Sequence, residues 1–171
     1  MIQLGLLLVL LLSGCTGIPE GVSAVSGFEV SRYLGKWYEI ARLNHGFERG
    51  LTRVTADYRL REDGGIDVIN SGYNPETGTW ERAEGLAYFV GAPDRGRLKV
   101  SFFGPFYGGY NIIELDKQNY RYALVAGPDR DYLWILSRTP VLDQARLDTL
   151  IAKAKDLGFA TDQLIFTEQE Q

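Results

Sequence analysis

The sequence predicts an all-β protein, built as an eight-stranded antiparallel up-and-down β-barrel with one C-terminal α-helix and a short last strand. Three observations lead to this prediction. The 171 residues include 20 glycines, ten tyrosines and eight phenylalanines, a composition typical of aromatic-rich strands joined by tight turns. Eight strand-like segments follow one another between turn signals. A sheet of that many neighbouring strands leaves two exposed edges unless it closes into a barrel.

The N-terminal segment, residues 1–14, is expected to be a signal peptide rather than part of the fold. Its apolar run, residues 4–12, is too short for a permanent membrane-spanning helix and has the length of a signal-peptide core. Residues 15–27 are small, polar and weakly patterned, and we expect them to form a lipidated tether. The barrel domain is then expected to occupy residues 28–171.

The signal segment leads directly into Leu12-Ser13-Gly14-Cys15, which resembles the lipobox of bacterial lipoproteins. This resemblance implies a diacylglyceryl cysteine at Cys15, cleavage before it, and acylation of the new amine by a chain such as palmitate. The residue after the cysteine is Thr16 and not aspartate, which in this class points to a lipid anchor in the outer membrane. Because Cys15 is the only cysteine, the alternative is a thiol that stands there by chance.

The strands are expected in chain order, each bounded by glycine, proline, asparagine or aspartate. Their predicted ranges are residues 35–43, 51–61, 66–73, 79–90, 97–103, 110–115, 120–126 and 131–138. Alternation is clearest in the second strand, where Ala56 and Tyr58 share one face, and in the fifth, where Val100 and Phe102 do. This period-two pattern indicates one apolar and one polar face. The glycine- and aromatic-rich residues 104–109 are expected to form a loop.

The pattern changes after the last of these strands. Apolar residues including Leu147 and Leu150 recur at a spacing of three to four, which predicts one amphipathic helix. Asp143 can cap its start and Gly158 can end it. A short last strand is expected at residues 163–167.

Two distant residues are expected to meet at one end of the barrel. Gly35 opens the first strand, and Trp37 shares the inward face with Glu39 and Ala41. Arg138 ends the eighth strand, which runs antiparallel to the first, so its guanidinium can stack on the indole of Trp37. We therefore expect Gly35, Trp37 and Arg138 to be structural residues of a closed end. The opposite end carries longer loops with more Gly, Phe and Tyr, and is expected to be open.

With these residues placed, the chain resembles the lipocalin family. The signature Gly35-x-Trp37-Tyr38 opens the first strand, and Arg138, followed by Thr139-Pro140 and a helix, matches a second family motif. The resemblance is greatest to bacterial outer-membrane lipoprotein lipocalins and to apolipoprotein D. It is carried by residues 32–42, 47–51, 100–111 and 127–138. It implies a barrel with a cavity for an apolar ligand, and for bacterial members fatty acids or phospholipids, particularly lysophospholipids.

The residues give no support for catalysis or nucleic-acid binding. The net charge is −4 without a basic run, so we expect no nucleic-acid partner. His45 is the only histidine, and we expect it to be exposed in the loop after the first strand. One histidine without a partner cysteine gives no metal site. A Ser–His–acid triad would need His45, and an exposed loop residue is not expected to serve in one. We therefore expect no enzyme activity, no metal and no cofactor; a lipid-modifying enzyme that uses His45 is the least favoured hypothesis.

An eight-stranded barrel can hold one small ligand if its inward side chains leave room. The predicted ligand-binding residues are Ala56, Tyr58, Val68, Asn70, Ala87, Phe89, Val100, Phe102, Tyr110, Tyr132 and Trp134. Among them the tyrosines and Asn70 can hydrogen-bond a polar head group. The alternative is that small inward residues such as Gly72 and Gly85 only accommodate larger neighbours in a filled core.

Two functional hypotheses follow. In the first, a membrane-anchored barrel binds or carries a lysophospholipid or fatty acid in the cell envelope. In the second, the barrel is filled and its aromatic open-end loop around Phe106 and Tyr107 binds another protein, a second copy of the chain included. For that loop, a lid, a membrane contact, a protein interface and a plug folded into the barrel all stay open at this point.

Overall fold

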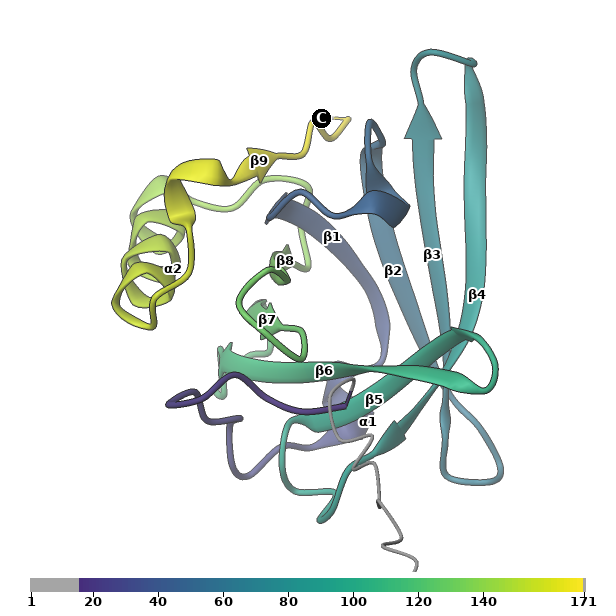
Figure 1. Ribbon diagram of the computed structural model, residues 1–171, viewed down its shortest axis with the longest axis vertical. Helices are drawn as coiled ribbons and strands as arrows, with labels where there is room; N and C mark the ends of the chain where they lie inside the picture. The colour runs from purple at the N-terminus through teal and green to yellow at the C-terminus, as the bar shows by residue number, and fades with distance from the viewer. Residues whose placement is uncertain (1–15, 171) are drawn as a thin grey trace, which may run out of the picture.

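The computed structural model describes residues 16–170 and shows a closed antiparallel barrel with a helix packed on its outside (Figure 1). The eight-stranded barrel, the C-terminal helix and the short last strand are confirmed. The strands are β1 Gly35–Arg42, β2 Thr52–Leu60, β3 Ile66–Asn74, β4 Thr79–Phe89, β5 Arg97–Phe103, β6 Phe106–Leu115, β7 Tyr122–Ala126, β8 Leu133–Ser137 and β9 Ile165–Phe166. The helices are α1 Val30–Tyr33 and α2 Gln144–Asp156, with short 3-10 turns η1 Gly46–Glu48 and η2 Thr161–Gln163. The predictions for residues 1–15, including Cys15, lie outside the described residues.

The barrel closes through β1, which pairs with β8 on one side and with β2 on the other. The pairing with β2 covers only Gly35 to Tyr38, the half of the strand near the closed end. Beyond that point β1 and β2 separate, and β9 takes the place of β2 beside Ala41 and Arg42. The barrel is therefore continuous at the closed end and has a seam at the open end.

The seam is filled by the C-terminal strap, which we define as residues 165–169. The amide of Thr167 donates to the carbonyl of Ile40, and the amide of Arg53 on β2 donates to the carbonyl of Glu168. The side-chain amide of Gln169 donates to the carbonyl of Glu39 at 2.8 Å and to that of Val54 at 2.9 Å. The strap thus supplies backbone partners that β1 and β2 do not give each other, as buried backbone groups require.

The hydrophobic core has two parts. One fills the closed half of the barrel with inward side chains such as Trp37, Ile112 and Val125. The other lies between the outer face of the barrel and α2, where Leu147 and Leu150 are buried. Asp143 caps α2 by accepting the amide of Arg146 at 2.9 Å, as its sequence pattern predicts. No helix within residues 16–170 is long and apolar enough to cross a bilayer.

Three local predictions need correction. A bulge in β1 between Glu39 and Ala41 shifts the alternation, so Ala41 faces α2 and not the barrel interior, because one extra residue reverses the facing of those after it. The expected loop at residues 104–109 is mostly strand: a two-residue turn, Gly104-Pro105, pairs Phe103 with Phe106. Residues 16–27, expected to be a tether, lie against the barrel, where Val22 is buried and the amide of Val25 donates to the carbonyl of Ile112.

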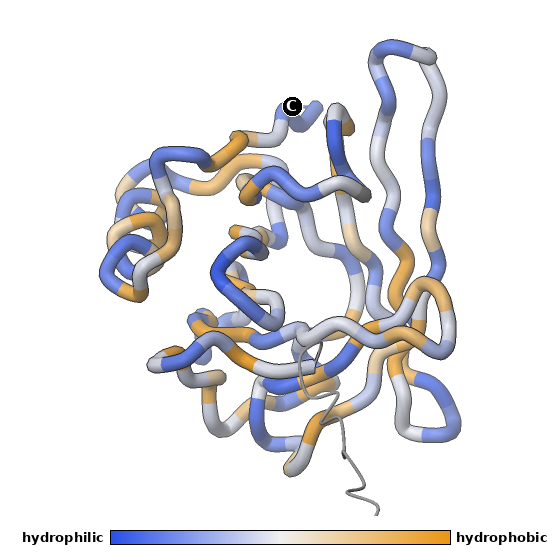
Figure 2. Tube along the Cα trace, in the orientation of Figure 1, coloured by the Kyte–Doolittle hydropathy of each residue, from blue (hydrophilic) through white to orange (hydrophobic). Residues whose placement is uncertain are grey.

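The β3–β4 hairpin extends beyond the rest of the barrel (Figure 1). Its outer part is mostly hydrophilic or neutral, and hydrophobic residues gather where these strands join the barrel wall (Figure 2). Burial follows the same division, since Ala83 is exposed and Ala87, four residues later on β4, is buried. The part of the barrel that can enclose a ligand therefore begins near Ala87.

Candidate functional site

An apolar cavity opens into the barrel from the end opposite Trp37. Its volume is about 90 Å³. This is room for roughly six to nine groups of the size of a water molecule. All eight barrel strands except β7 contribute to its wall, together with η1, α1 and Phe28. The barrel is therefore not filled, which removes the premise of the protein-interaction hypothesis.

The structure brings together nine of the eleven residues predicted to bind ligand. The cavity is lined by Ala56, Tyr58, Val68, Asn70, Ala87, Val100, Phe102, Tyr110 and Trp134. Phe89 lies outside the lining and packs edge-on against Phe28, with ring centroids 6.2 Å apart. Tyr132 is also outside it and stacks on His45, with centroids 5.8 Å apart. Strand alternation predicts the facing of these two side chains but not the neighbours that cover them.

Two of the small residues do accommodate larger side chains. A Cβ at Gly85 would lie 2.8 Å from a ring carbon of Phe102, and a Cβ at Gly72 would lie 2.9 Å from a methyl carbon of Leu51. Those distances are too short for real contacts. Gly72 and Gly85 therefore make room for larger neighbours, as the alternative of a filled core predicts for them. The barrel as a whole nevertheless keeps its cavity.

Three tyrosine hydroxyl groups form the polar part of the cavity floor. Tyr110 is 2.7 Å from the hydroxyl of Tyr33 and 2.8 Å from that of Tyr58. Burial raises the pKa of each of the three above its ordinary value. Tyr58 and Tyr110 were expected to hold a polar head group. Instead their hydroxyl groups are hydrogen-bonded to each other, deep in the barrel. Tyr33, which α1 carries into this floor, was not predicted.

The closed end has the geometry expected of Gly35, Trp37 and Arg138. The guanidinium carbon of Arg138 lies 4.0 Å from the ring centroid of Trp37, whose Nε1 donates to the carbonyl of Tyr33 at 2.8 Å. Arg138 also donates to the carbonyls of Lys36 at 2.9 Å and Arg32 at 2.8 Å. Gly35 has a φ of 87°, a conformation that favours glycine. These groups join α1, β1 and the end of β8 beneath the cavity.

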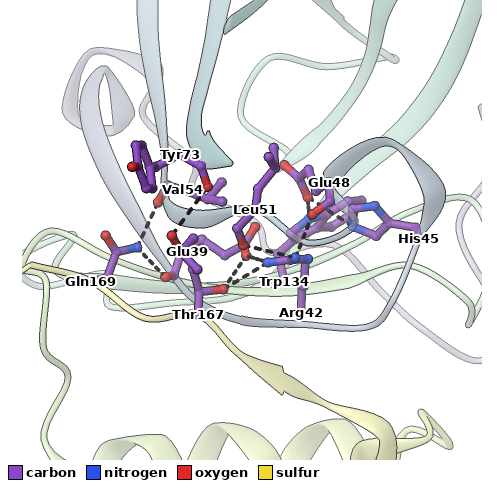
Figure 3. A network of polar contacts seen from close by, with 11 residues as sticks. Glu39, Arg42, His45, Glu48, Leu51, Val54, Tyr73, Trp134, Thr167 and Gln169 are labelled. Atoms are coloured by element: carbon purple, nitrogen blue, oxygen red, sulfur yellow. Dashed lines mark hydrogen bonds and ion pairs between the residues drawn. The ribbon is translucent and has the colours of Figure 1, made fainter. Parts of the chain in front are cut away.

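A buried polar network stands at the open side of the cavity (Figure 3). Arg42 donates to the carboxylate of Glu39 at 2.5 Å, to the hydroxyl of Thr167 at 3.1 Å and to the carbonyl of Glu48 at 2.7 Å. The hydroxyl of Thr167 in turn donates to Glu39. Glu39 and Glu48 both line the cavity. A carboxylate buried in this way needs a partner of opposite charge, and Arg42 supplies it to Glu39.

Glu48 completes the network on the side of η1. Its Oε2 accepts from Nε1 of Trp134 at 3.1 Å and lies 3.2 Å from Nε2 of His45. The histidine was expected to be an exposed loop residue; instead it is buried, with its ring against Tyr132 and Trp134. The sequence signal was the spacing of His45 and Glu48, three residues apart, which a single turn such as η1 brings onto one side.

The pKa values of Glu48 and His45 are both shifted. Burial, aided by the negative charge of Glu39, raises the pKa of Glu48 from its ordinary 4.5 to about 8. Burial, aided by the positive charge of Arg42, lowers the pKa of His45 from 6.5 to about 4. At neutral pH both side chains are therefore neutral, and the Glu39–Arg42 pair is the charged part of the network.

The opposite shifts predict the pH dependence of stability. The unfolded chain releases the Glu48 proton above about pH 4.5 while the folded protein keeps it to about 8, so this group lowers stability as pH rises through that range. His45 acts the other way between about 4 and 6.5. The two trends oppose each other up to pH 6.5, and above it only Glu48 acts. We expect the free energy of unfolding to fall by about 1 kcal/mol in total from pH 6.5 to 8, because the full slope is reached only between the two pKa values at the ends of this range.

Urea unfolding at several pH values between 6.5 and 8 measures this slope. The Glu48→Gln variant keeps a neutral side chain of the same shape and is expected to lose the slope. An unchanged slope in that variant would assign the pH dependence to another group.

A closed barrel with an apolar cavity open at one end defines a binding protein for small hydrophobic molecules. The comparisons with known proteins agree with this class. The family model described as a lipocalin-like domain matches residues 28–169. The chain therefore belongs to the lipocalin family, whose members are binding proteins and not enzymes.

Two bacterial relatives match nearly the full chain. Outer membrane lipoprotein Blc of Vibrio cholerae is 58% identical over 160 residues, covering 94% of this chain and 94% of its own. The protein of the same name from Escherichia coli K12 is 60% identical over 151 residues, covering 88% and 85%. Insecticyanin of the tobacco hornworm Manduca sexta has the same fold, with a TM-score of 0.71 at 22% identity over 91% of this chain and 88% of its own. The protein is an outer membrane lipoprotein of the lipocalin family.

Proposed function

We propose that the protein binds one single-chain lipid, a lysophospholipid or a fatty acid, with the acyl chain inside the barrel, while a lipid on Cys15 anchors it to the outer membrane from the periplasmic side. The observation that carries the proposal is the cavity itself, narrow and lined mainly by aliphatic and aromatic side chains. Burial of apolar surface is the main source of affinity for an acyl chain, at about 0.8 kcal/mol per CH₂.

The polar groups of the cavity lining favour a lysophospholipid over a fatty acid. Within the described residues, two carboxyl groups line it, those of Glu39 and Glu48, and no lysine, arginine or histidine does. Arg42 points its donors at Glu39, Thr167 and backbone carbonyls. A fatty-acid carboxylate drawn inside would meet the carboxylate of Glu39 and would find no free cation among the lining residues. A lysophospholipid whose tail enters first keeps its phosphate at the mouth, in contact with water.

Titration of the purified protein with lysophosphatidylethanolamine and with oleate tests the proposal. We expect one bound lipid per chain by native mass spectrometry, with tighter binding of the lysophospholipid. Failure of both lipids to bind at micromolar concentration would reject the proposal.

A matched pair of variants on β4 tests whether the cavity is the site. Ala87 lines the cavity and is buried, so Ala87→Phe is expected to fill it and weaken binding about tenfold or more, equivalent to about 1.4 kcal/mol. Ala83→Phe makes the same change on the exposed part of the strand and is expected to bind normally. Thermal melts establish that both variants are folded. Equal binding by the two variants would place the lipid elsewhere.

A further inference from the structure

A second hollow lies on the outside of the barrel, apart from the ligand cavity. It is a groove open to solvent between residues 18–24 of the N-terminal segment and the residues that connect β4 to β5. Its volume is about 300 Å³. None of the residues that line it also lines the barrel cavity. The groove is therefore a separate place where a ligand could bind.

Two arginines line this groove, one on each side of a glycine that is packed against the barrel. Gly96 is buried, and a Cβ there would lie 2.9 Å from the Cβ of Ile112 and 2.9 Å from a methyl carbon of Val25. Its amide donates to the carbonyl of Val25, and its carbonyl accepts the amide of Ile112. These backbone contacts fix the start of β5, and Arg95 and Arg97 both border the groove from there.

The charges of the two guanidinium groups are not neutralised. Within residues 16–170, the side chains of Arg95 and Arg97 make no hydrogen bond or ion pair, and Nε of Arg97 is buried without an acceptor. Asp94 adjoins Arg95 in the chain but is exposed and does not line the groove. Arg61 and Arg121, by contrast, each pair with an aspartate. Because a buried donor without an acceptor is unfavourable, the groove offers donors that an incoming acceptor can satisfy.

The donors and the wall of the groove match a phosphate group joined to a small carbon skeleton. A guanidinium is planar and presents paired N–H donors to two oxygens of one phosphate. Ser23 adds a hydroxyl group to the lining, and Ile18, Val22 and Val90 add apolar surface. We infer that this groove, which we call the arginine groove, binds a phosphate group, either free phosphate or the phosphodiester of a lipid head group.

The position of the arginine groove in the chain brings it near lipid head groups. Ile18, which lines it, follows Cys15 by three residues, a distance of at most about 11 Å. With the proposed lipid on Cys15, the surface of the bilayer lies within reach of the groove, and anionic head groups attract arginine there. The lipid as the source of the phosphate therefore rests on the proposed anchoring, whereas the phosphate site itself does not.

Isothermal titration calorimetry of the full-length lipoprotein in a nonionic detergent tests the inference. The probes are inorganic phosphate and glycerophosphoglycerol, which is the head group of phosphatidylglycerol without acyl chains and so has no tail for the barrel cavity. We expect the protein to bind phosphate, and Arg97→Gln to weaken this binding about tenfold or more. Arg95→Gln is expected to have a smaller effect, because Arg95 is exposed and Arg97 is half-buried.

Arg82→Gln is the matched control, because it removes the same charge from an exposed pair with Glu84; it is expected to bind both probes normally. Binding of glycerophosphoglycerol at least as tight as that of phosphate would identify lipid head groups as the source. Weaker or absent binding of glycerophosphoglycerol would identify free phosphate. Thermal melts establish that the variants are folded.

Three outcomes would overturn the inference. The first is that neither probe binds at millimolar concentration. The second is that Arg97→Gln and Arg95→Gln bind as the unaltered protein does, or lose no more than Arg82→Gln. The third is loss of phosphate binding in Ala87→Phe, since the probe would then occupy the barrel cavity, which this change fills. Lysophospholipid binding by Arg97→Gln is expected to be normal, so failure of the arginine groove and failure of the proposed function are distinguished.

Discussion

Replacing Arg42 by methionine is expected to lower the free energy of unfolding by about 3–5 kcal/mol. The side chain is 1% exposed and provides hydrogen bonds to Glu39, Thr167 and the carbonyl of Glu48. Methionine fills similar space but leaves the carboxylate of Glu39 buried without its cation. A buried charge that loses its partner is far more destabilising than the loss of an exposed ion pair. Urea unfolding followed by fluorescence measures the change.

Two controls separate this effect from a loss of packing. Arg59→Met makes the same substitution in an exposed pair with Asp57 and is expected to cost less than about 1 kcal/mol. The double variant Glu39→Met, Arg42→Met removes both charges and is expected to regain much of the loss, because no unpaired charge remains. A double variant as unstable as Arg42→Met would show that packing and not charge dominates.

Replacing Trp37 by alanine is expected to cost a similar 3–5 kcal/mol. Trp37 is 0% exposed, donates its indole N–H to the carbonyl of Tyr33, and carries the guanidinium of Arg138 on its face. Alanine leaves a void at the closed end and removes both contacts. Because Trp37 does not line the cavity, the folded variant is expected to bind lysophospholipid with an unchanged Kd.

Unfolding experiments on three variants check this assignment. Trp37→Phe keeps most of the buried ring and is expected to lose less stability than Trp37→Ala. Trp80→Ala removes an indole that is largely exposed and is expected to change stability by no more than about 0.5 kcal/mol. A Trp37→Ala variant with near-native stability, or one that is stable but binds no lipid, would contradict the structural role given to this residue.

Much of the barrel could be predicted because alternation and chain direction are strong constraints. The facing of Ala56, Tyr58, Val100 and Phe102 follows from period two, and these four side chains line the cavity. The meeting of Trp37 and Arg138 follows from the antiparallel order of eight strands. These features depend on patterns that extend over many residues, so one local irregularity does not change them.

The polar network could not be predicted because it depends on local irregularities. The bulge in β1 places Ala41 outside the barrel while Glu39 stays inside. The turn η1 folds His45 and Glu48 into the wall, and nothing in the hydrophobic pattern marks that loop as buried. The partner of Glu39 in the strap, Thr167, is separated from it by 128 residues, and no short-range signal connects them.

The C-terminal strap also determines when the barrel can become complete during synthesis. The first strand, β1, leaves the ribosome early, yet Glu39 bonds to Thr167 and Gln169, which are made 128 and 130 residues later. Until those residues are in place, backbone groups along the seam between β1 and β2 have no partner. The buried ion pair of Glu39 and Arg42 also lacks its hydrogen bonds to Thr167. Contacts of such sequence separation form late, since the chain must first close a long loop. Closure of the seam at the open end therefore requires the C-terminal strap and is expected to be among the late steps of folding.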